Sequence, residues 1–456
     1  MKLHKTSLIA LRATACLVVV VANQAFAQYQ RAWTADGWLD RQDSAADITL
    51  DAGGNPYVGG ATRDVYGSPP TSLYEGGVAA KFDPAGNREW LSYAYTTRGL
   101  DHVADVGVDA SGNVFIAGET YRYSAGAESF LIKFSNGGTR LWERHLGTSD
   151  NEFGKSLAVD GSGNAYVSGS TTGDLTGAGK HGYDPFVAKY DPNGVLLWLQ
   201  QYADPALNSS PASMAISPGH GIYLGFGGTI DGGLARLDDA GQIQWFTKPN
   251  YSSSPTLHTD LFGVASDADG DVYAAGISDF AYVNGLPFIG GKAVVARHDL
   301  DGTLLWSQLL PSVAQSTAND VTLDSQGNIY ICGGMNRVVN GVDAGDYDAF
   351  WAKFSPAGQL LWFEHWGTEA TESAAGLAVD AAGRVFVVAT QFRTVNTYIN
   401  ADGDVSVIRF DPVPEPASLC LAATMAFVGA TATRAVAKRR TPTSRCYVNS
   451  KAFLQS

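Results

Sequence analysis

Residues Asp105–Trp142 have the sequence DVGVDASGNVFIAGETYRYSAGAESFLIKFSNGGTRLW, and the pattern of this stretch recurs along the chain. It contains two pairs of apolar segments, each pair joined by a short turn with glycine, and a longer polar segment between the pairs. In such turns an Asp or Ser side chain can accept a hydrogen bond from the backbone N–H two residues on, and Gly supplies the positive φ. The stretch therefore predicts four antiparallel strands of about five residues each.

Three markers place seven copies of this unit in the sequence. The first is a tryptophan on the last strand of each copy: Trp33, Trp90, Trp142, Trp198, Trp245, Trp306 and Trp362. The second is an aspartate that opens the first turn: Asp51, Asp109, Asp160, Asp267, Asp324 and Asp380, with Ser217 in a degenerate fourth copy. The third is a second turn with a glycine four residues before the tryptophan. A repeat of about 55 residues with four strands predicts an all-β, seven-bladed propeller.

The two ends of the repeat array are complementary. The seventh copy stops at Asp411-Pro412 without a tryptophan strand, whereas Gln28–Asp36 carries Trp33 with no strands before it. We expect the N-terminal segment to supply the last strand of the seventh blade, because closing the ring removes two unpaired sheet edges. The predicted propeller domain is residues 28–412.

The N-terminus has the three parts of a secretory signal peptide. Lys2, Lys5 and Arg12 precede a short apolar run, and Ala25-Phe26-Ala27 fits a small-x-small cleavage site. We predict that residues 1–27 are removed after Ala27, and favour this over an uncleaved membrane helix. Residues 28–412 then contain Cys332 as their single cysteine, so no disulfide framework supports the domain.

The predicted domain is strongly acidic. The whole chain has a formal charge of −14, but only one of its 45 acidic residues lies outside residues 28–412, against nine of its 31 basic residues. The domain therefore carries −22, which excludes nucleic acid and anionic lipid as natural partners. The charge favours either the attraction of cations or solubility outside the cell.

One face of the propeller is the expected binding surface. With strands A to D in each blade, the A–B and C–D turns are short and lie at one end, whereas the B–C and D–A connections are long, variable and lie at the other. Aromatic side chains recur in the B–C stretches: Tyr66, Tyr74, Tyr121, Tyr123, Tyr183, Phe280, Tyr282, Tyr347 and Tyr398. Aromatic rings with hydroxyl groups suit glycan or protein recognition. The alternative is that most of these rings pack the loops onto the blades.

Three carboxylates occupy one repeat position on the innermost strands. Asp47, Asp105 and Asp320 each stand four residues before the aspartate of the first turn. If they converge in the central channel they could bind a hard cation such as Ca²⁺; the favoured alternative is that they cap strand ends. The DADGD segment Asp267–Asp271 resembles a calcium loop but lacks the glutamate at its twelfth position, which favours a hairpin turn.

No catalytic motif of a known spacing is present: HExxH, GxSxG and the P-loop are absent from the sequence. We therefore expect a non-enzymatic binding or scaffold module for glycan or protein. The alternative is an enzyme built on a propeller, acting on extracellular polysaccharide or as a quinone-dependent dehydrogenase.

Two resemblances extend this interpretation. The body, through D-x-x-G-N-x-Y-V-x-G and D-x-F-V-x-K-Y-D-x-x-G-x-x-x-W, resembles the SBBP-type bacterial β-propeller repeats, which implies an extracytoplasmic propeller without a known common reaction. Residues 413–440, with Pro414, Glu415 and Pro416, an apolar run over 417–432 and a basic cluster, resemble the PEP-CTERM sorting signal of bacteria that use an exosortase. That resemblance implies transient anchoring in the inner membrane, processing by a sorting protease, and delivery to the cell surface, outer membrane or extracellular matrix. A polar tail, residues 441–456, follows the basic cluster.

Overall fold

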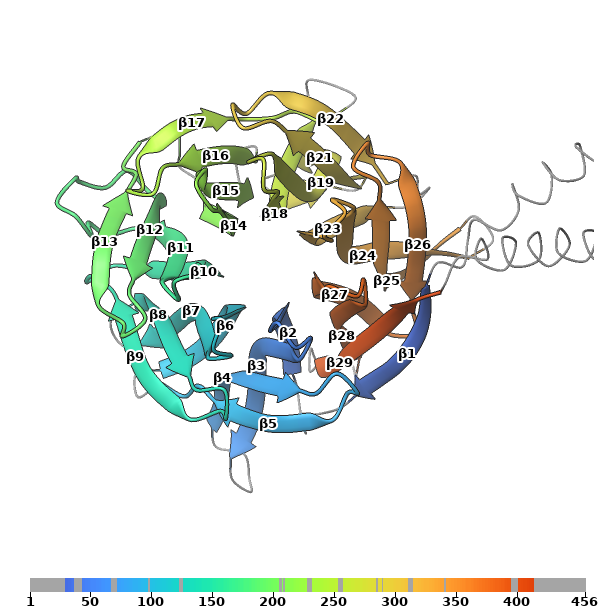
Figure 1. The fold of residues 1–456 in the computed structure, drawn as a ribbon, viewed down its shortest axis with the longest axis horizontal. Helices are drawn as coiled ribbons and strands as arrows, with labels where there is room; N and C mark the ends of the chain where they lie inside the picture. The colour runs from blue at the N-terminus through green and yellow to red at the C-terminus, as the bar shows by residue number, and fades with distance from the viewer. Residues whose placement is uncertain are drawn as a thin grey trace, which may run out of the picture. The chain divides into compact units, whose positions relative to one another are not determined.

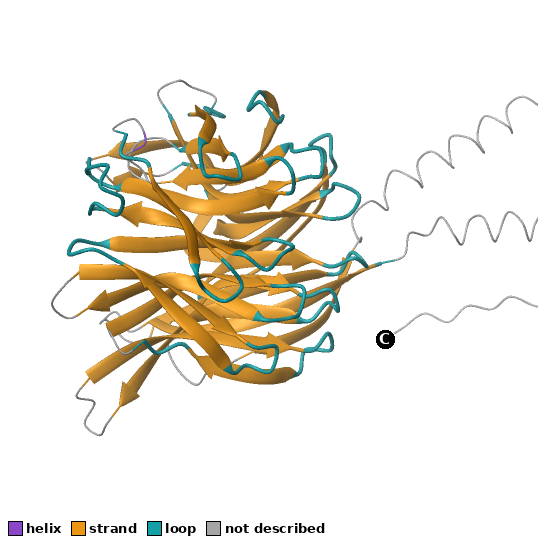
Figure 2. Ribbon diagram, turned by 60° about the vertical axis from the view of Figure 1, so that its left-hand side comes forward, coloured by secondary structure: helices purple, strands orange, loops and turns teal. Residues whose placement is uncertain are grey.

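The computed structural model describes residues 29–36, 43–66, 72–96, 99–122, 126–204, 207, 210–227, 232–252, 257–283, 286–288, 290–310, 315–339, 342–394 and 401–413. These residues form strands joined by loops, with almost no helix (Figure 2). The strands make seven antiparallel sheets arranged in a ring (Figure 1), which confirms the predicted seven-bladed propeller. The signal peptide with Ala27 and the sorting signal with Pro414, Glu415 and Pro416 lie outside the described residues.

Each blade follows the order A to D from the channel outward. Blades 1 to 3 consist of β2 (Asp43–Leu50), β3 (Pro56–Tyr66), β4 (Ser72–Phe82), β5 (Arg88–Tyr93), β6 (Gly99–Val108), β7 (Val114–Arg122), β8 (Gly126–Phe134), β9 (Arg140–Leu146), β10 (Glu152–Val159), β11 (Ala165–Thr171), β12 (Asp184–Tyr190) and β13 (Leu196–Gln201). Blades 4 and 5 consist of β14 (Ser210–Ser217), β15 (Gly221–Gly227), β16 (Gly233–Leu237), β17 (Ile243–Thr247), β18 (His258–Ser266), β19 (Val272–Val283), β21 (Lys292–His298) and β22 (Leu304–Leu309). Blade 6 consists of β23 (Ser316–Leu323), β24 (Ile329–Val339), β25 (Val342–Phe354) and β26 (Leu360–Trp366).

Blade 7 combines both ends of the array. It contains β27 (Thr371–Val379), β28 (Val385–Thr394), β29 (Ala401–Pro412) and, as its outer strand, β1 (Tyr29–Asp36). In the antiparallel pairing of β1 with β29, Gln30 lies opposite Asp411 and Trp33 opposite Arg409. Figure 1 shows β1 on the outer side of β29. The predicted closure of the ring by the N-terminal strand is confirmed.

The fourth blade is present as predicted, and two other features of the sheets differ from the sequence-based expectation. The degenerate fourth copy forms a complete blade, because Gly219 and Gly221 supply the positive φ that its SPGHG turn needs (81° and 102°). Blade 5 has an additional short strand, β20 (Leu286–Phe288), which pairs with β19 in the B–C connection. Many strands are also longer than five residues, since B and C strands extend beyond the ring as hairpins.

The first turns have the predicted chemistry. In blade 2, Asp109 Oδ1 accepts hydrogen bonds from the backbone N–H of Ser111 and of Asn113, both at 2.9 Å, and Gly112 has a φ of 75°. The bond to the fourth residue was not predicted. It closes the bulge of the turn, and it recurs at Asp51, Asp160, Asp267, Asp324 and Asp380.

The hydrophobic core is divided among the junctions between blades. The described residues form seven apolar clusters, one at each junction, and each contains one of the seven repeat tryptophans. A blade of four strands cannot bury its faces alone, so stability comes from stacking neighbours. All seven clusters, as far as the structure describes their residues, lie between Tyr29 and Phe410.

The repeat tryptophans also hold consecutive blades together by hydrogen bonds. Trp90 on β5 of blade 1 donates from Nε1 to the backbone oxygen of Asn136, 2.8 Å away in the C–D turn of blade 2. Its ring lies under Gly138, where a Cβ would approach Trp90 to 2.8 Å; this explains the glycine of the second turn. The same bond joins Trp33 to Pro84, Trp142 to Pro192, Trp245 to Leu300 and Trp306 to Pro356.

The junction between blades 6 and 7 cannot use this contact, because the chain is interrupted where the C–D turn of blade 7 would lie. Tyr29 takes the place of the turn. Its ring packs on Trp362 with centroids 4.5 Å apart, and its hydroxyl lies 2.8 Å from that of Tyr330. The first residue of β1 therefore completes the junction that precedes it, while Trp33 completes the one that follows.

No helix in the described ranges is long and apolar enough to span a membrane. The apolar run over 417–432, predicted to act as a membrane segment, is outside those ranges. The compact unit that contains the ring ends at Pro412.

Candidate functional site

Three aromatic rings lie together on the face formed by the B–C and D–A connections. Tyr121 is the second-last residue of β7 in blade 2, Phe153 is the second residue of β10 in blade 3, and Tyr183 immediately precedes β12 of blade 3. The ring centroids of Tyr121 and Phe153 are 6.5 Å apart, and those of Phe153 and Tyr183 are 6.3 Å apart. Tyr121 is 46% exposed and Tyr183 53% exposed. We call this set the aromatic platform.

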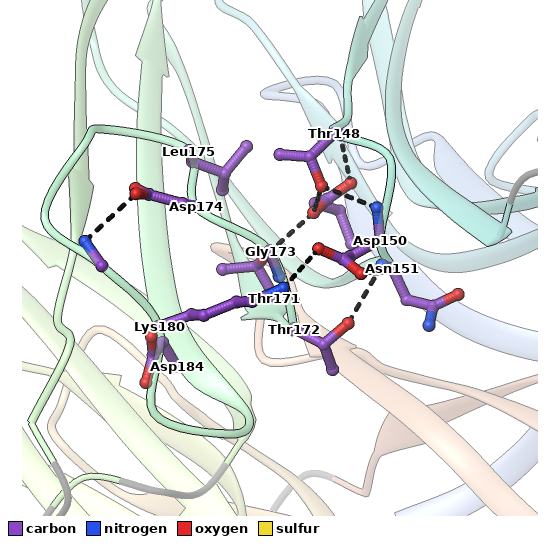
Figure 3. Close-up of polar contacts among 12 residues, drawn as sticks. Thr148, Asp150, Asn151, Thr171, Thr172, Gly173, Asp174, Leu175, Lys180 and Asp184 are labelled. Atoms are coloured by element: carbon purple, nitrogen blue, oxygen red, sulfur yellow. Dashed lines mark hydrogen bonds and ion pairs between the residues drawn. The ribbon is translucent and has the colours of Figure 1, made fainter.

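The loop that carries Tyr183 is held in one conformation by hydrogen bonds (Figure 3). Asp174 accepts from the backbone N–H of Gly177 at 2.6 Å and of Gly179 at 3.2 Å. Gln201, buried at the end of β13, donates to the backbone oxygens of Gly173 and Gly179 and to Asp184 Oδ2. These bonds fix both sides of the twelve-residue connection between β11 and β12, and therefore hold the backbone that carries Tyr183.

A buried carboxylate fixes the D–A connection beside Phe153. Glu152 is fully buried and accepts from the backbone N–H and the hydroxyl of Thr148 and from the hydroxyl of Thr171. Lys180 also pairs with Asp150 across the two loops at 2.8 Å (Figure 3). A Thr–acid contact of this kind recurs with Asp101 in blade 2 and Glu372 in blade 7. The platform therefore rests on polar groups that the repeat itself encodes.

Charged groups of both signs border the platform. Lys155 Nζ lies 5.7 Å from the Phe153 ring centroid and bonds both carboxylate oxygens of Glu119, at 2.9 and 3.0 Å. His102 Nδ1 is 3.8 Å from Glu119. Lys155 and Glu119 therefore neutralise each other beside the rings. This arrangement suits a neutral polar ligand that stacks on the rings.

The other predicted aromatic residues do not form a second group of this kind among the described side chains. Phe280 is 2% exposed and its ring packs against His258, so the expectation that it faces a ligand is wrong: it is a core residue. Tyr347 is half-buried on β25. The side chains of Tyr66, Tyr74 and Tyr282, and the residues Tyr123 and Tyr398, lie outside what the structure describes.

Sequence reasoning missed Phe153 as a platform member. It lies where a D–A connection enters strand A, whereas the predicted ligand-binding residues all lie in B–C stretches. Its signal would have been its position directly after Glu152 at the start of strand A, which places its side chain on the same face as the B–C loops.

Asp47, Asp105 and Asp320 line one cavity in the central channel, which is the condition that the cation hypothesis required. A β-bulge precedes each of them. In blade 1 it is a shift in the strand register between Ala45 and Asp47, and the register shifts at the same repeat position in all seven A strands. A bulge re-aims the next side chain. The three carboxylates border a cavity of about 250 Å³ that all seven blades line. The cavity follows the inner strands from these residues toward the A–B turns, away from the platform face.

The hydrogen bonds of the three carboxylates join neighbouring blades. Asp105 Oδ2 accepts from the backbone N–H of Leu157 at 2.7 Å in blade 3, and Asp320 Oδ2 accepts from that of Leu377 at 2.9 Å in blade 7. Ser213 accepts from Val264 in the same way. The described residues contain no group of three His, Cys, Asp or Glu side chains placed to hold a metal ion. These hydrogen bonds indicate that the side chains cap the inner strand of the next blade, and they favour this role over cation binding.

Burial and mutual repulsion change the acidity of these carboxyls. Burial, followed by the charges of Asp105 and Asp320, holds the pKa of Asp47 well above its ordinary value. Burial also raises the pKa of Asp105, whose side chain is hydrogen-bonded to that of Asp47, and raises the pKa of Asp320 to about 7. The Asp47–Asp105 contact therefore needs a proton between the two carboxyls.

The DADGD segment is a hairpin turn, as favoured. Asp267 Oδ1 accepts from the backbone N–H of Asp269 and Asp271, and Asp271 Oδ2 lies 2.8 Å from Arg297 Nη2. Its carboxylates are thus committed to the turn and to the adjacent strand.

Comparison with known proteins agrees with this fold. Residues 142–176, from the outer strand of blade 2 into the B–C connection of blade 3, match the SBBP family, described as a beta-propeller repeat. The chain is a β-propeller that contains one match to this repeat. No curated protein matches its sequence.

Among solved structures, this propeller is similar to a virginiamycin B lyase from Staphylococcus aureus, with a TM-score of 0.51 and 8% identity over 84% of this chain and 100% of the lyase. It is also similar to the polysaccharide lyase Uly1 (TM-score 0.44, 10% identity, 80% of this chain and 89% of the other). A quinoprotein alcohol dehydrogenase-like protein from Bacteroides thetaiotaomicron gives 0.40, at 10% identity over 72% and 66%. At these identities the likeness concerns the fold and does not transfer a reaction.

Proposed function

We propose that this propeller is an exported, non-enzymatic module that binds a carbohydrate chain on the face formed by its B–C and D–A connections. The observation that carries the proposal is the aromatic platform. Three rings from two blades, two of them about half exposed, stand on loops whose backbone is fixed by buried polar groups. Pre-organised rings bind a flexible chain at a lower entropic cost than mobile ones.

The charge around the platform favours a neutral glycan over an anionic polymer as the ligand. The predicted domain has a strongly negative charge, and the one lysine at the platform is neutralised by Glu119. Sugar rings present apolar C–H faces to aromatic side chains and hydroxyls to the polar rim. A protein partner with an exposed aromatic epitope would use the same three rings. Their succession, with centroids 6.5 and 6.3 Å apart, favours an extended carbohydrate chain over such a partner.

Truncation of the platform tests this function. In the 28–412 protein, Tyr121→Ala and Tyr183→Ala are each expected to weaken binding of a neutral polysaccharide about 5- to 30-fold, since each removes one stacking surface worth roughly 1–2 kcal/mol. Binding is measured by calorimetry after a glycan array has selected the polysaccharide.

Tyr93→Ala is the matched control, because Tyr93 is a comparably exposed tyrosine (44%) whose ring stacks on Tyr95 in blade 1, away from the platform. Equal affinity of the wild type and both platform variants, or turnover of the polysaccharide, would contradict the proposal.

Export is a separate part of the proposal, and it rests on the two chain ends. The protein recovered from the producing cell is expected to begin at Gln28 and to lack the segment after the Pro414–Pro416 motif. N-terminal sequencing and intact mass measurement of the surface and culture fractions check this. A full-length chain confined to the cytoplasm would contradict export without affecting the binding proposal.

A further inference from the structure

A second cavity lies on the outside of the ring, at the junction of blades 6 and 7. It has a volume of about 360 Å³, which is within the range of small-ligand sites. Strand β26 contributes Glu364, His365 and Trp366; strand β25 contributes Trp351; and β1 contributes Tyr29 and Arg31. It is therefore separate from the aromatic platform, which belongs to blades 2 and 3.

The cavity exists because blade 7 has no C–D turn. In blade 2, Arg144 stands two residues after the repeat tryptophan and donates to the backbone oxygens of Gly194 and Asn193 in the C–D turn of blade 3. Glu364 has the same position after Trp362, but no C–D turn of blade 7 lies over it, since β29 ends at Pro412 and β1 begins at Tyr29. The interruption that allows ring closure leaves a space at this junction.

Two tryptophans that line the cavity do not belong to the repeat pattern. Seven of the ten tryptophans in the chain are repeat markers, and the other three are Trp38, Trp351 and Trp366. Two of these three line the cavity. At the position of Trp351, three residues before the end of strand C, blades 1, 2 and 3 have Ala79, Leu131 and Val187. Packing of the repeat does not require an indole there.

Trp351 also carries a polar group without a partner. Its side chain is 2% exposed, its ring packs against Phe410 at 4.8 Å, and its Nε1–H has no acceptor among the described residues. A buried donor without a partner costs about 1–3 kcal/mol, so an oxygen supplied by a bound molecule would relieve a real penalty. Arg31 and Glu364, both exposed, have no ion-pair partner within the described part of the chain.

We propose that this cavity is a second carbohydrate site, which takes one neutral sugar ring. The partly exposed indole of Trp366 provides a stacking surface for the apolar face of a pyranose. Arg31 and the Trp351 N–H donate to ring or hydroxyl oxygens, and Glu364 accepts from hydroxyls. Because Arg31 and Glu364 have opposite charges, the cavity favours a neutral polyhydroxylated ligand over an acid or an amine.

The test uses methyl glycosides of glucose, galactose and mannose as probes, with saturation-transfer NMR and tryptophan fluorescence on the 28–412 protein. At least one probe is expected to bind saturably to the wild type. Trp366→Ala and Glu364→Ala are each expected to weaken that binding at least about 5-fold, and Trp351→Phe, which removes the N–H, by a similar factor.

The controls separate this site from the platform and from misfolding. A Tyr121→Ala/Tyr183→Ala double variant should bind the probe like the wild type, so failure of the platform proposal would leave this result intact. Glu364 is exposed on the outermost strand, so its replacement leaves the core unchanged. Absence of saturable binding by every probe, or wild-type affinity in the Glu364 and Trp366 variants, would overturn the proposal.

Discussion

Trp33→Ala is expected to lower the free energy of unfolding by about 3 kcal/mol, the lower end of the cost of removing a large core ring, because Trp33 is partly buried. Trp33 packs with Phe386 in the cluster between blades 7 and 1, and its indole N–H donates to Pro84 O at 3.0 Å. It is also the main anchor of β1, the one strand that reaches its blade from the other end of the chain. The loss should therefore release β1 as well as the contact itself.

Two matched variants separate these effects. Trp33→Phe retains most of the ring packing and should cost only about 1 kcal/mol, for the lost hydrogen bond. Trp90→Ala removes the equivalent contact between blades 1 and 2, where the chain is continuous, and should destabilise less than Trp33→Ala. Urea unfolding gives the free energies, and hydrogen exchange reports the opening of β1. A Trp33→Ala protein with unchanged exchange in β1 would show that ring closure does not depend on this residue.

Asp47→Asn is expected to stabilise the protein at pH 8, by roughly 2–4 °C in melting temperature, and to have little effect near pH 4. The pKa of Asp47 is raised, first by burial and then by Asp105 and Asp320, above its ordinary value of 3.8. A folded-state pKa above the unfolded one gives stability that is complete below 3.8 and is lost as pH rises through the folded value. Asparagine avoids that loss, and its amide can still bond both Ile48 N–H and Asp105.

Asp51→Asn, on the next turn of the same strand pair, provides a control of opposite sign. Burial alone would raise the pKa of Asp51, but the hydrogen bonds from Asn55, Tyr57 and Gly53 outweigh it and lower that pKa. Its contribution is present above 3.8 and lost as the pH falls, so Asp51→Asn should destabilise at pH 8 and less at pH 4. Melting curves of the three proteins across this pH range are the measurement. If the Asp47→Asn difference does not grow with pH, the carboxyls do not carry the proposed proton.

The same melting experiment distinguishes strand capping from cation binding. Capping predicts the same wild-type melting temperature at pH 8 with Ca²⁺ and with a chelator. A calcium-dependent increase that is absent from Asp47→Asn would restore the cation hypothesis for Asp47, Asp105 and Asp320.

The ring was predictable because its determinants are local. The turn at Asp109–Asn113 needs an Asp side chain and a positive-φ glycine within five residues, and both recur with the tryptophan at a constant spacing. The missing strand of blade 7 and the surplus strand at the N-terminus then determine the closure. The turns, the tryptophan spacing and the strand count of each blade are all independent of how two blades pack.

The candidate sites were predictable only in part, because they depend on contacts between blades. Tyr121 and Tyr183 could be placed on the correct face, but their approach to Phe153 depends on the angle between blades 2 and 3. Likewise, the convergence of Asp47 and Asp105 followed from their shared repeat position, whereas the bond from Leu157 to Asp105 depends on blade spacing. Phe280 was placed wrongly because hydrophobicity in a variable connection does not tell a core ring from a surface ring.

The shared blade also has a consequence for the order of assembly. Tyr29 and Pro412 are neighbours in space but lie at opposite ends of the array, so every intervening blade must exist before they can meet. Local strand pairs form before contacts of such large sequence separation, whose loop-closure entropy is greatest. During synthesis the first strand therefore has no pairing partner until the last strand emerges. The chain can therefore commit to its final, closed form only after its C-terminal strand has been delivered.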